Sequence, residues 1–116
     1  MDDITLCHLH ELRENSSRSF QPGGSATTQS IFLVRKQDQV YGYINSCPHT
    51  GAPLEWMPNQ FLSLDGQHIQ CALHGARFVI ENGLCISGPC VNAALTPVHI
   101  KIIDQKIICE KPANQS

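Results

Sequence analysis

The 116-residue chain has the length of one domain, and its 41% apolar and 16% charged residues are typical of globular proteins. Eight basic and ten acidic residues give a formal net charge of −2 and are spread along the sequence. Because there is no run of lysine or arginine, the composition argues against a nucleic-acid-binding surface and against a polybasic membrane patch.

The N-terminal residues and the cysteines bear on location. The start, MDDITLCHLH, has neither a basic region nor an apolar core, and no stretch reaches the roughly 20 apolar residues of a membrane span. We therefore expect a cytoplasmic protein. In that compartment the six cysteines are expected to be thiols or metal ligands rather than disulfides.

Short β-branched runs closed by turn residues dominate the chain and predict an all-β fold. A first strand is expected at Ile4–Leu9, and four hairpins follow it. Their strands and turns are Ser30–Arg35 and Gln39–Ile44 across Lys36–Asp38, Phe61–Leu64 and Gln67–Gln70 across Asp65-Gly66, Phe78–Ile80 and Leu84–Ile86 across Asn82-Gly83, and Val98–Ile103 and Lys106–Cys109 across Asp104-Gln105. The last pair is expected to supply the most regular core strands.

Helical signal is weak. One or two turns at His10–Glu14 are the only candidate, because no window sustains apolar residues at a spacing of three and four. The segment Gln21–Ser25, QPGGS, has the composition of a mobile surface loop within the same domain.

Two cysteine–histidine pairs lie in segments rich in proline and glycine. Cys47 is followed by His49, and Cys71 is followed by His74. Thiolate and imidazole are good ligands for borderline transition metals. One interpretation is a tetrahedral zinc site, although zinc fingers place two cysteines before two histidines. The other is a two-iron, two-sulfide cluster with one iron on the cysteines and one on the histidines, which gives the interleaved order a reason.

The motifs C-P-H-T-G and C-A-L-H-G resemble those of the Rieske iron–sulfur family, whose boxes are Cys-x-His and Cys-x-x-His. The resemblance implies a [2Fe-2S] cluster with its inner iron on Cys47 and Cys71 and its outer iron on the Nδ1 atoms of His49 and His74. It also implies one domain over residues 1–116. That domain would combine an antiparallel β-sandwich base with a small cluster-binding subdomain of two loops at about residues 45–90.

The chain departs from the high-potential members of that family. Those members carry an extra cysteine in each box, which form a disulfide, where this chain has Ala52 and Leu73. They also place hydrogen-bond-donating serine and tyrosine where this chain has Ala76 and Phe78. Without these donors we expect a potential at the low end of the general Rieske range, on the order of −150 mV. Gly88-Pro89 is similar to the proline-containing loop that covers the cluster in the family.

Other cysteines and histidines are assigned to structural roles. His8 and His10 alternate on a predicted strand, where an exposed face is favoured over a shared metal. Cys85 is expected to be a small core residue, and a disulfide between the terminal strands stays open as an alternative. The cysteines read as reduced thiols are Cys7, Cys85, Cys90 and Cys109.

A cluster with one accessible edge stores a single electron, so we expect a carrier and not an enzyme. The chain is similar to ferredoxins that pass electrons from a flavoprotein reductase to a ring-hydroxylating or related oxygenase. It has no candidate for the oxygenases' own iron site of two histidines and a carboxylate. The expected docking surface is the tip formed by Pro48–Gly51 and Leu73–Ala76.

Two alternatives remain open. One is the small Rieske-like subunit of a nitrite reductase. The other, from a different class, is a structural zinc module that binds a partner protein. Visible absorption separates iron–sulfur from zinc, because only the iron–sulfur cluster is coloured.

Overall fold

The computed structural model describes residues 3–20, 30–46, 48, 54, 60–63, 65–71, 75–88 and 91–110. One 3-10 turn, η1 (Leu9–Glu11), is the only helical element in those ranges. The strands are β1 (Asp3–His8), β2 (Ser16–Phe20), β3 (Ile31–Lys36), β4 (Gln39–Ile44), β5 (His68–Gln70), β6 (Arg77–Val79), β7 (Cys85–Ser87), β8 (Pro97–Val98), β9 (Ile100–Ile103) and β10 (Lys106–Glu110). All of their pairings are antiparallel, which confirms the all-β prediction.

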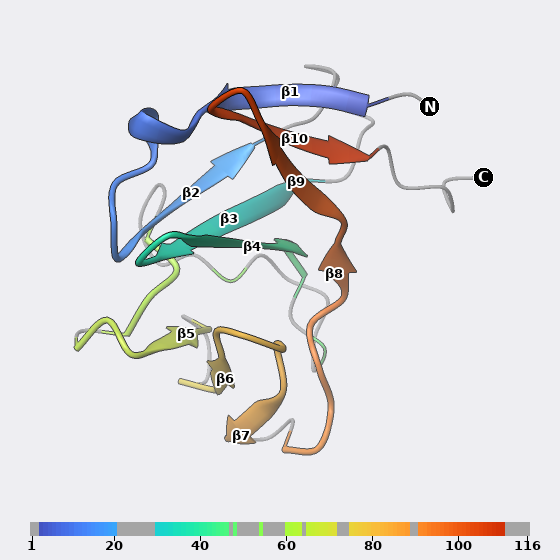
Figure 1. The fold of residues 1–116 in the computed structure, drawn as a ribbon. Coiled ribbons are helices and arrows are strands. Elements are labelled where there is room, and N and C mark those ends of the chain that lie inside the picture. The colour runs from blue at the N-terminus through green and yellow to red at the C-terminus, as the bar shows by residue number, and fades with distance from the viewer. Residues whose placement is uncertain are drawn as a thin grey trace.

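The strands form three sheets (Figure 1). Two larger sheets have the orders β1-β10-β9 and β2-β3-β4-β8, and the third, here called the small sheet, has the order β5-β6-β7. The small sheet lies at one end of the molecule, and the first and last strands, β1 and β10, lie at the other. The described segments between β4 and β8 therefore project from the body formed by the two larger sheets.

A single extended segment belongs to both larger sheets. β8 pairs with β4, whereas β9, separated from β8 only by His99, pairs with β10. Gly42 on β4 allows this crossing, because a Cβ atom there would lie 2.7 Å from Cγ1 of Ile100. The two larger sheets are thus joined at one corner by continuous backbone.

β3 is the strand on which the core is built. Ile31 and Leu33 belong to clusters that include buried residues of β1 and β10, whereas Phe32 and Val34 belong to the cluster that reaches the small sheet. The ring of Phe32 stacks on Phe61 with centroids 4.3 Å apart. Burial on both faces explains why this strand reads as an unbroken apolar run in the sequence.

The hairpin predictions are largely confirmed. Asp104 and Gln105 both have positive φ, 53° and 67°, as a tight two-residue connection requires. The connection between β6 and β7 is wider than expected, and in it Gly83 has a φ of 73°. The strand expected before β5 is reduced to one isolated bridge, between Leu62 and Ile69, and residue 64 lies outside the described part.

Sequence reasoning missed strand β2. Its residues, SSRSF, contain one apolar side chain, so neither alternation nor an apolar run marks them as a strand. β2 pairs with β3 over its full length, from Ser16 opposite Arg35 to Phe20 opposite Ile31, and lies at a sheet edge. Backbone pairing with an already buried strand, and not side-chain burial, defines this element.

The prediction that the last hairpin supplies two regular core strands is wrong for β9. Ile107 and Cys109 of β10 are fully buried, but Ile102 and Ile103 of β9 are 39% and 45% exposed. The reason is position, because β9 is the edge of its sheet and β10 is the centre.

The N-terminal strand lies one residue earlier than expected, at Asp3–His8 and not at Ile4–Leu9. β1 ends at His8 and the 3-10 turn follows at once, so the predicted alternation of His8 and His10 on a strand is wrong. Their ring centroids lie 5.5 Å apart. In the described ranges no three His, Cys, Asp or Glu side chains are placed to hold a metal ion, and no helix is long and apolar enough to cross a membrane.

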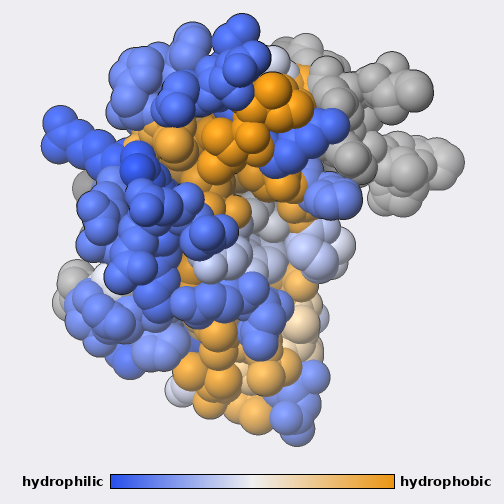
Figure 2. All heavy atoms as spheres, in the orientation of Figure 1, coloured by the Kyte–Doolittle hydropathy of each residue, from blue (hydrophilic) through white to orange (hydrophobic). Residues whose placement is uncertain are grey.

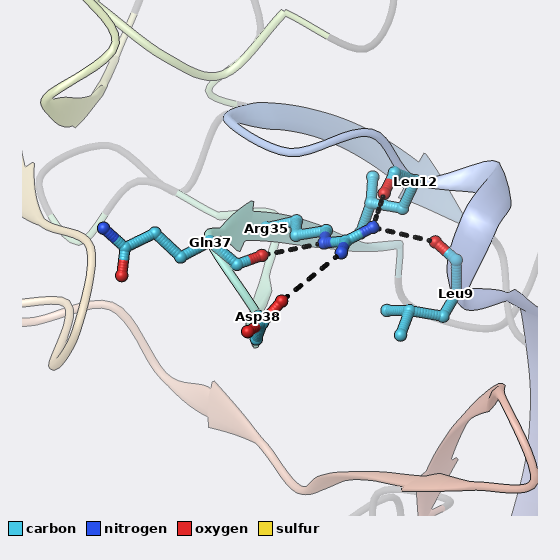
Figure 3. Close-up of polar contacts among 5 residues, drawn as sticks. All are labelled: Leu9, Leu12, Arg35, Gln37 and Asp38. Atoms are coloured by element: carbon cyan, nitrogen blue, oxygen red, sulfur yellow. Dashed lines mark hydrogen bonds and ion pairs between the residues drawn. The ribbon is translucent and has the colours of Figure 1, made fainter.

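Arg35 fastens the η1 segment to the β3–β4 hairpin (Figure 3). Its Nη1 donates to the backbone oxygen of Leu12 at 3.0 Å and to that of Leu9 at 3.4 Å. Its Nε donates to the backbone oxygen of Gln37 at 2.9 Å, and its Nη2 lies 3.8 Å from Oδ1 of Asp38. One guanidinium therefore binds backbone carbonyl groups of both the η1 segment and the turn, and the oxygen of Leu9 also accepts the N–H of Leu12 at 3.1 Å.

Candidate metal centre

The loop between β5 and β6 contains the second cysteine–histidine pair. The backbone N–H of Cys71 donates to the oxygen of Ala76 at 2.8 Å, and the N–H of Gly75 donates to the oxygen of Cys71 at 3.0 Å. Gly75 has a φ of 67°, a conformation that glycine adopts without strain. These two hydrogen bonds bring Gly75 and Ala76, which lead into β6, back beside Cys71, which follows β5.

The loop after β4 contains the first pair, and a buried asparagine closes it. Asn45 is 7% exposed, and its Oδ1 accepts a hydrogen bond from the N–H of Leu54 at 2.8 Å. Its own N–H donates to the oxygen of Ser30 at 3.0 Å. The segment that contains Cys47 and His49 therefore starts and ends at one place, beside the end of β4.

The bases of the two loops meet in one hydrophobic cluster. Leu54 from the first loop and Cys71 and Ala76 from the second are all buried there, together with Phe61 and Phe78. Each of the five is at most 1% exposed. Packing in the core, not proximity along the chain, brings the two loops together.

The segment after β7 presses against the second loop. Gly88 has a φ of 100°, and a Cβ atom there would lie 2.8 Å from Cα of Ala76. Only a residue without a side chain permits that approach. The covering role expected for Gly88-Pro89 stays a prediction, because Pro89 lies outside the described residues.

Charged side chains around the small sheet are held by local partners. Nζ of Lys36 lies 2.7 Å from Oε2 of Glu81 and lowers the pKa of that carboxyl group. The pKa of Asp65 is lowered by the hydroxyl of Ser63 at 2.6 Å and by the N–H of Gln67 at 3.0 Å. The pair of Lys36 and Glu81 ties the β6–β7 turn to the β3–β4 hairpin.

Tyr43 makes a second tie to that turn, and sequence reasoning did not single it out. Its hydroxyl donates to the oxygen of Ile80 at 2.7 Å, and its ring lies against Gly83, where a Cβ atom would approach Cε1 to 2.9 Å. Burial raises the pKa of Tyr43 to about 12. The only available signal was its place as an aromatic residue in the predicted strand at Gln39–Ile44, which does not reveal that its hydroxyl bonds to Ile80.

The structure describes one of the four predicted ligands. Cys71 is fully buried at the base of its loop. Cys47, His49 and His74 lie outside the described residues, so the ligand set stays a prediction. The core assignment of Cys85 is confirmed at 1% exposure.

Three of the cysteines predicted to be reduced thiols, Cys7, Cys85 and Cys109, are buried and form no disulfide. Cys7 and Cys109 do not form the disulfide that was left open. Burial raises the pKa of the Cys7 thiol, which favours its neutral form. Cys90 lies outside the described residues.

A fold of three antiparallel sheets with two loops closed over one core defines a known class of redox domain. The Rieske [2Fe-2S] domain family matches residues 2–109. The chain belongs to that family, and its cofactor is a [2Fe-2S] cluster. Among curated proteins, apoptosis-inducing factor 3 of Mus musculus is 27% identical over 105 residues, which are 90% of this chain. The chain spans only 16% of that relative's length.

Two solved structures illustrate the fold. The ferredoxin of carbazole 1,9a-dioxygenase from Nocardioides aromaticivorans IC177 has a TM-score of 0.77 at 22% identity, covering 97% of this chain and 100% of that chain. A putative small subunit of an NADPH nitrite reductase has a TM-score of 0.68 at 16% identity, covering 95% and 99%. At these identities the likeness shows a shared fold.

The described residues fit an iron–sulfur cluster. Cys71 offers a thiol, the ligand that such clusters require, in a site closed to solvent. Gly75 and Gly88 allow backbone to come close where side chains would collide or strain. Ala76 and Phe78 supply the apolar surroundings that control solvent access to a metal site.

Proposed function

We propose that the protein is a one-electron carrier of the Rieske ferredoxin type, which takes electrons from a flavoprotein reductase and passes them to an oxygenase or a similar redox enzyme. The observation that carries this proposal is the buried Cys71, at the base of a braced loop that shares its core with the base of the Cys47 loop. The fold shared with the ferredoxin of a dioxygenase supports an oxygenase as the acceptor.

In this proposal Cys47 and Cys71 hold the inner iron, and His49 and His74 hold the outer iron. When bound, the cluster accepts and releases a single electron. The chain's own contribution is to fix the two loops relative to each other. Asn45 closes the first loop, and the hydrogen bonds at the base of the second loop hold Cys71 in place.

The side chains next to the second loop support a low reduction potential. Ala76 and Phe78 are 1% and 0% exposed and have no hydroxyl group to donate to a sulfur atom. A reduced cluster gains less stabilisation when such donors are missing. We therefore propose a potential at the low end of the Rieske range, on the order of −150 mV.

We also propose a cytoplasmic location and one domain over residues 1–116, with the cluster-binding subdomain at about 45–90. Buried cysteines that remain thiols support a reducing compartment. The core shared by the small sheet and β3 supports a single folding unit.

The ligand assignment is tested with two cysteines of the same buried cluster. Cys71→Ala should abolish the visible absorption and the EPR signal of the reduced cluster, because one iron loses a thiolate. Cys85→Ala, at a site of similar burial, should retain both. A colourless wild-type protein that contains zinc would favour the structural zinc module instead.

A second candidate is the small subunit of a nitrite reductase, because a putative subunit of that kind has the same fold along almost its whole length. The two candidates differ in the acceptor. Anaerobically reduced protein is mixed with a Rieske-type terminal oxygenase and, separately, with the large subunit of a nitrite reductase. Oxidation of the cluster by the oxygenase supports the ferredoxin proposal, and stable binding to the reductase subunit alone supports the alternative.

A further inference from the structure

An exposed apolar surface lies on the β7 side of the small sheet. Leu84, Ile86 and Val91 are 40%, 45% and 49% exposed, whereas Cys85 between the first two is buried. Figure 2 shows hydrophobic surface gathered at the end of the molecule where β7 lies. We call these three residues the β7 face.

The segment that contains the β7 face has no charged residue of its own, and the charge beside it is the exposed Arg77 of β6, which pairs with Ser87. No aspartate, glutamate, lysine or arginine occurs between Glu81 and Lys101. The three apolar side chains gain little from an oppositely charged partner, and they cost little to desolvate against an apolar one.

The β7 face is continuous with the loop of the candidate metal centre. Gly88 lies between Ile86 and Val91 and presses on Ala76, whose oxygen accepts the N–H of Cys71. Two contacts therefore separate the face from the backbone of a proposed iron ligand. A protein seated here would be close to the cluster, and electron transfer is faster over shorter distances.

We propose that Leu84, Ile86 and Val91 form the docking surface for the electron-accepting oxygenase, and that apolar contact rather than charge attraction drives the association. This inference rests on the proposed function. Three side chains suit the small interfaces of transient redox encounters, whereas a stable dimer buries more surface. Through Gly88 the surface adjoins Ala76, the described end of the second predicted tip segment, and adds the β7 side to it.

The test compares two isoleucines of equal exposure. Ile86→Glu places a charge on the β7 face, and Ile103→Glu places one on β9, where the native side chain is likewise 45% exposed. Val91→Glu is a second variant on the face. The probe is the terminal oxygenase of carbazole 1,9a-dioxygenase from Nocardioides aromaticivorans, and stopped-flow absorption gives the second-order rate of cluster oxidation.

We expect Ile86→Glu and Val91→Glu to slow the reaction about tenfold, the order of loss at an interface hot spot, and Ile103→Glu to leave it unchanged. Oxidation by ferricyanide, which needs no docking, should be equal in all variants. The wild-type rate should change less than about twofold between about 0.05 and 0.5 M NaCl, since salt does not screen the apolar contacts proposed to drive docking.

Equal rates for Ile86→Glu, Val91→Glu and Ile103→Glu would overturn the docking surface while leaving the carrier role intact. A steep fall of the wild-type rate with salt would overturn the apolar driving force. If the oxygenase does not oxidise wild-type protein with an intact cluster, the proposed function fails, and the docking surface fails with it.

Discussion

Replacing Tyr43 with phenylalanine should weaken the attachment of the small sheet to the rest of the protein. Tyr43 is 3% exposed on β4, which leads into the Cys47 loop, and its hydroxyl donates to Ile80, which directly follows β6. The ring also contacts Phe32, with centroids 5.9 Å apart. Tyr43→Phe keeps the ring but leaves the buried oxygen of Ile80 without this donor.

The size of the effect follows from two observations. A buried acceptor that loses its donor costs about 1–3 kcal/mol of unfolding free energy. In addition, the pKa of Tyr43 is raised to about 12, so the folded state favours the neutral phenol. That contribution is complete below the unfolded-state pKa of about 10 and is lost as pH rises through the folded value. At about 1.4 kcal/mol per pKa unit, the loss is about 3 kcal/mol.

The assay is urea unfolding followed by far-UV circular dichroism at neutral pH and at several values up to pH 12. Tyr41→Phe is the control, because Tyr41 lies on the same strand and is only partly buried. Tyr43→Phe should be about 1–3 kcal/mol less stable than this control at neutral pH. It should also lack the Tyr43 component of the alkaline loss. The reasoning is refuted if both variants are equally stable and lose stability in parallel above pH 10.

Two further predictions concern glycine and an ion pair. Gly88→Ala should lower the unfolding free energy by about 1–3 kcal/mol and speed the loss of cluster absorbance on heating, since φ is 100° and the new Cβ atom would meet Ala76. Gly66→Ala is the control, because Gly66 has a positive φ but open space around it, and it should lower the unfolding free energy less. Lys36→Met should lower the unfolding free energy by less than about 1 kcal/mol, because its pair with Glu81 is partly exposed. Because the pKa of Glu81 is lowered in the folded protein, the stabilisation from this pair is present at pH values above the unfolded-state pKa of Glu81. It is lost as the pH falls through the folded-state pKa. Urea titrations near pH 7 and pH 3 measure this, and an unchanged variant at both would contradict it.

Several features of the fold were predictable from local sequence. The turn at Asp104-Gln105 and the apolar run of β3 follow from residue types within a few positions of each other. The family and its cofactor were likewise readable, because the cysteine and histidine motifs lie in two short segments. Local chemistry suffices where a feature depends on its own residues.

Other features depended on distant neighbours. β2 exists because it pairs with β3, and β9 is exposed because it ended at a sheet edge. The polar composition of β2 did not reveal that it pairs with β3, and the apolar composition of β9 did not reveal that it lies at a sheet edge.

The sequence by itself determined the family, with its [2Fe-2S] cofactor, and most of the hairpins of the fold. Tertiary structure decided that Asn45 closes one loop on Leu54, that Gly88 leans on the other, and that Tyr43 ties β4 to the β6–β7 turn. These contacts join residues that are distant in the sequence. They form only once the sheets have packed against each other, so local sequence patterns do not predict them.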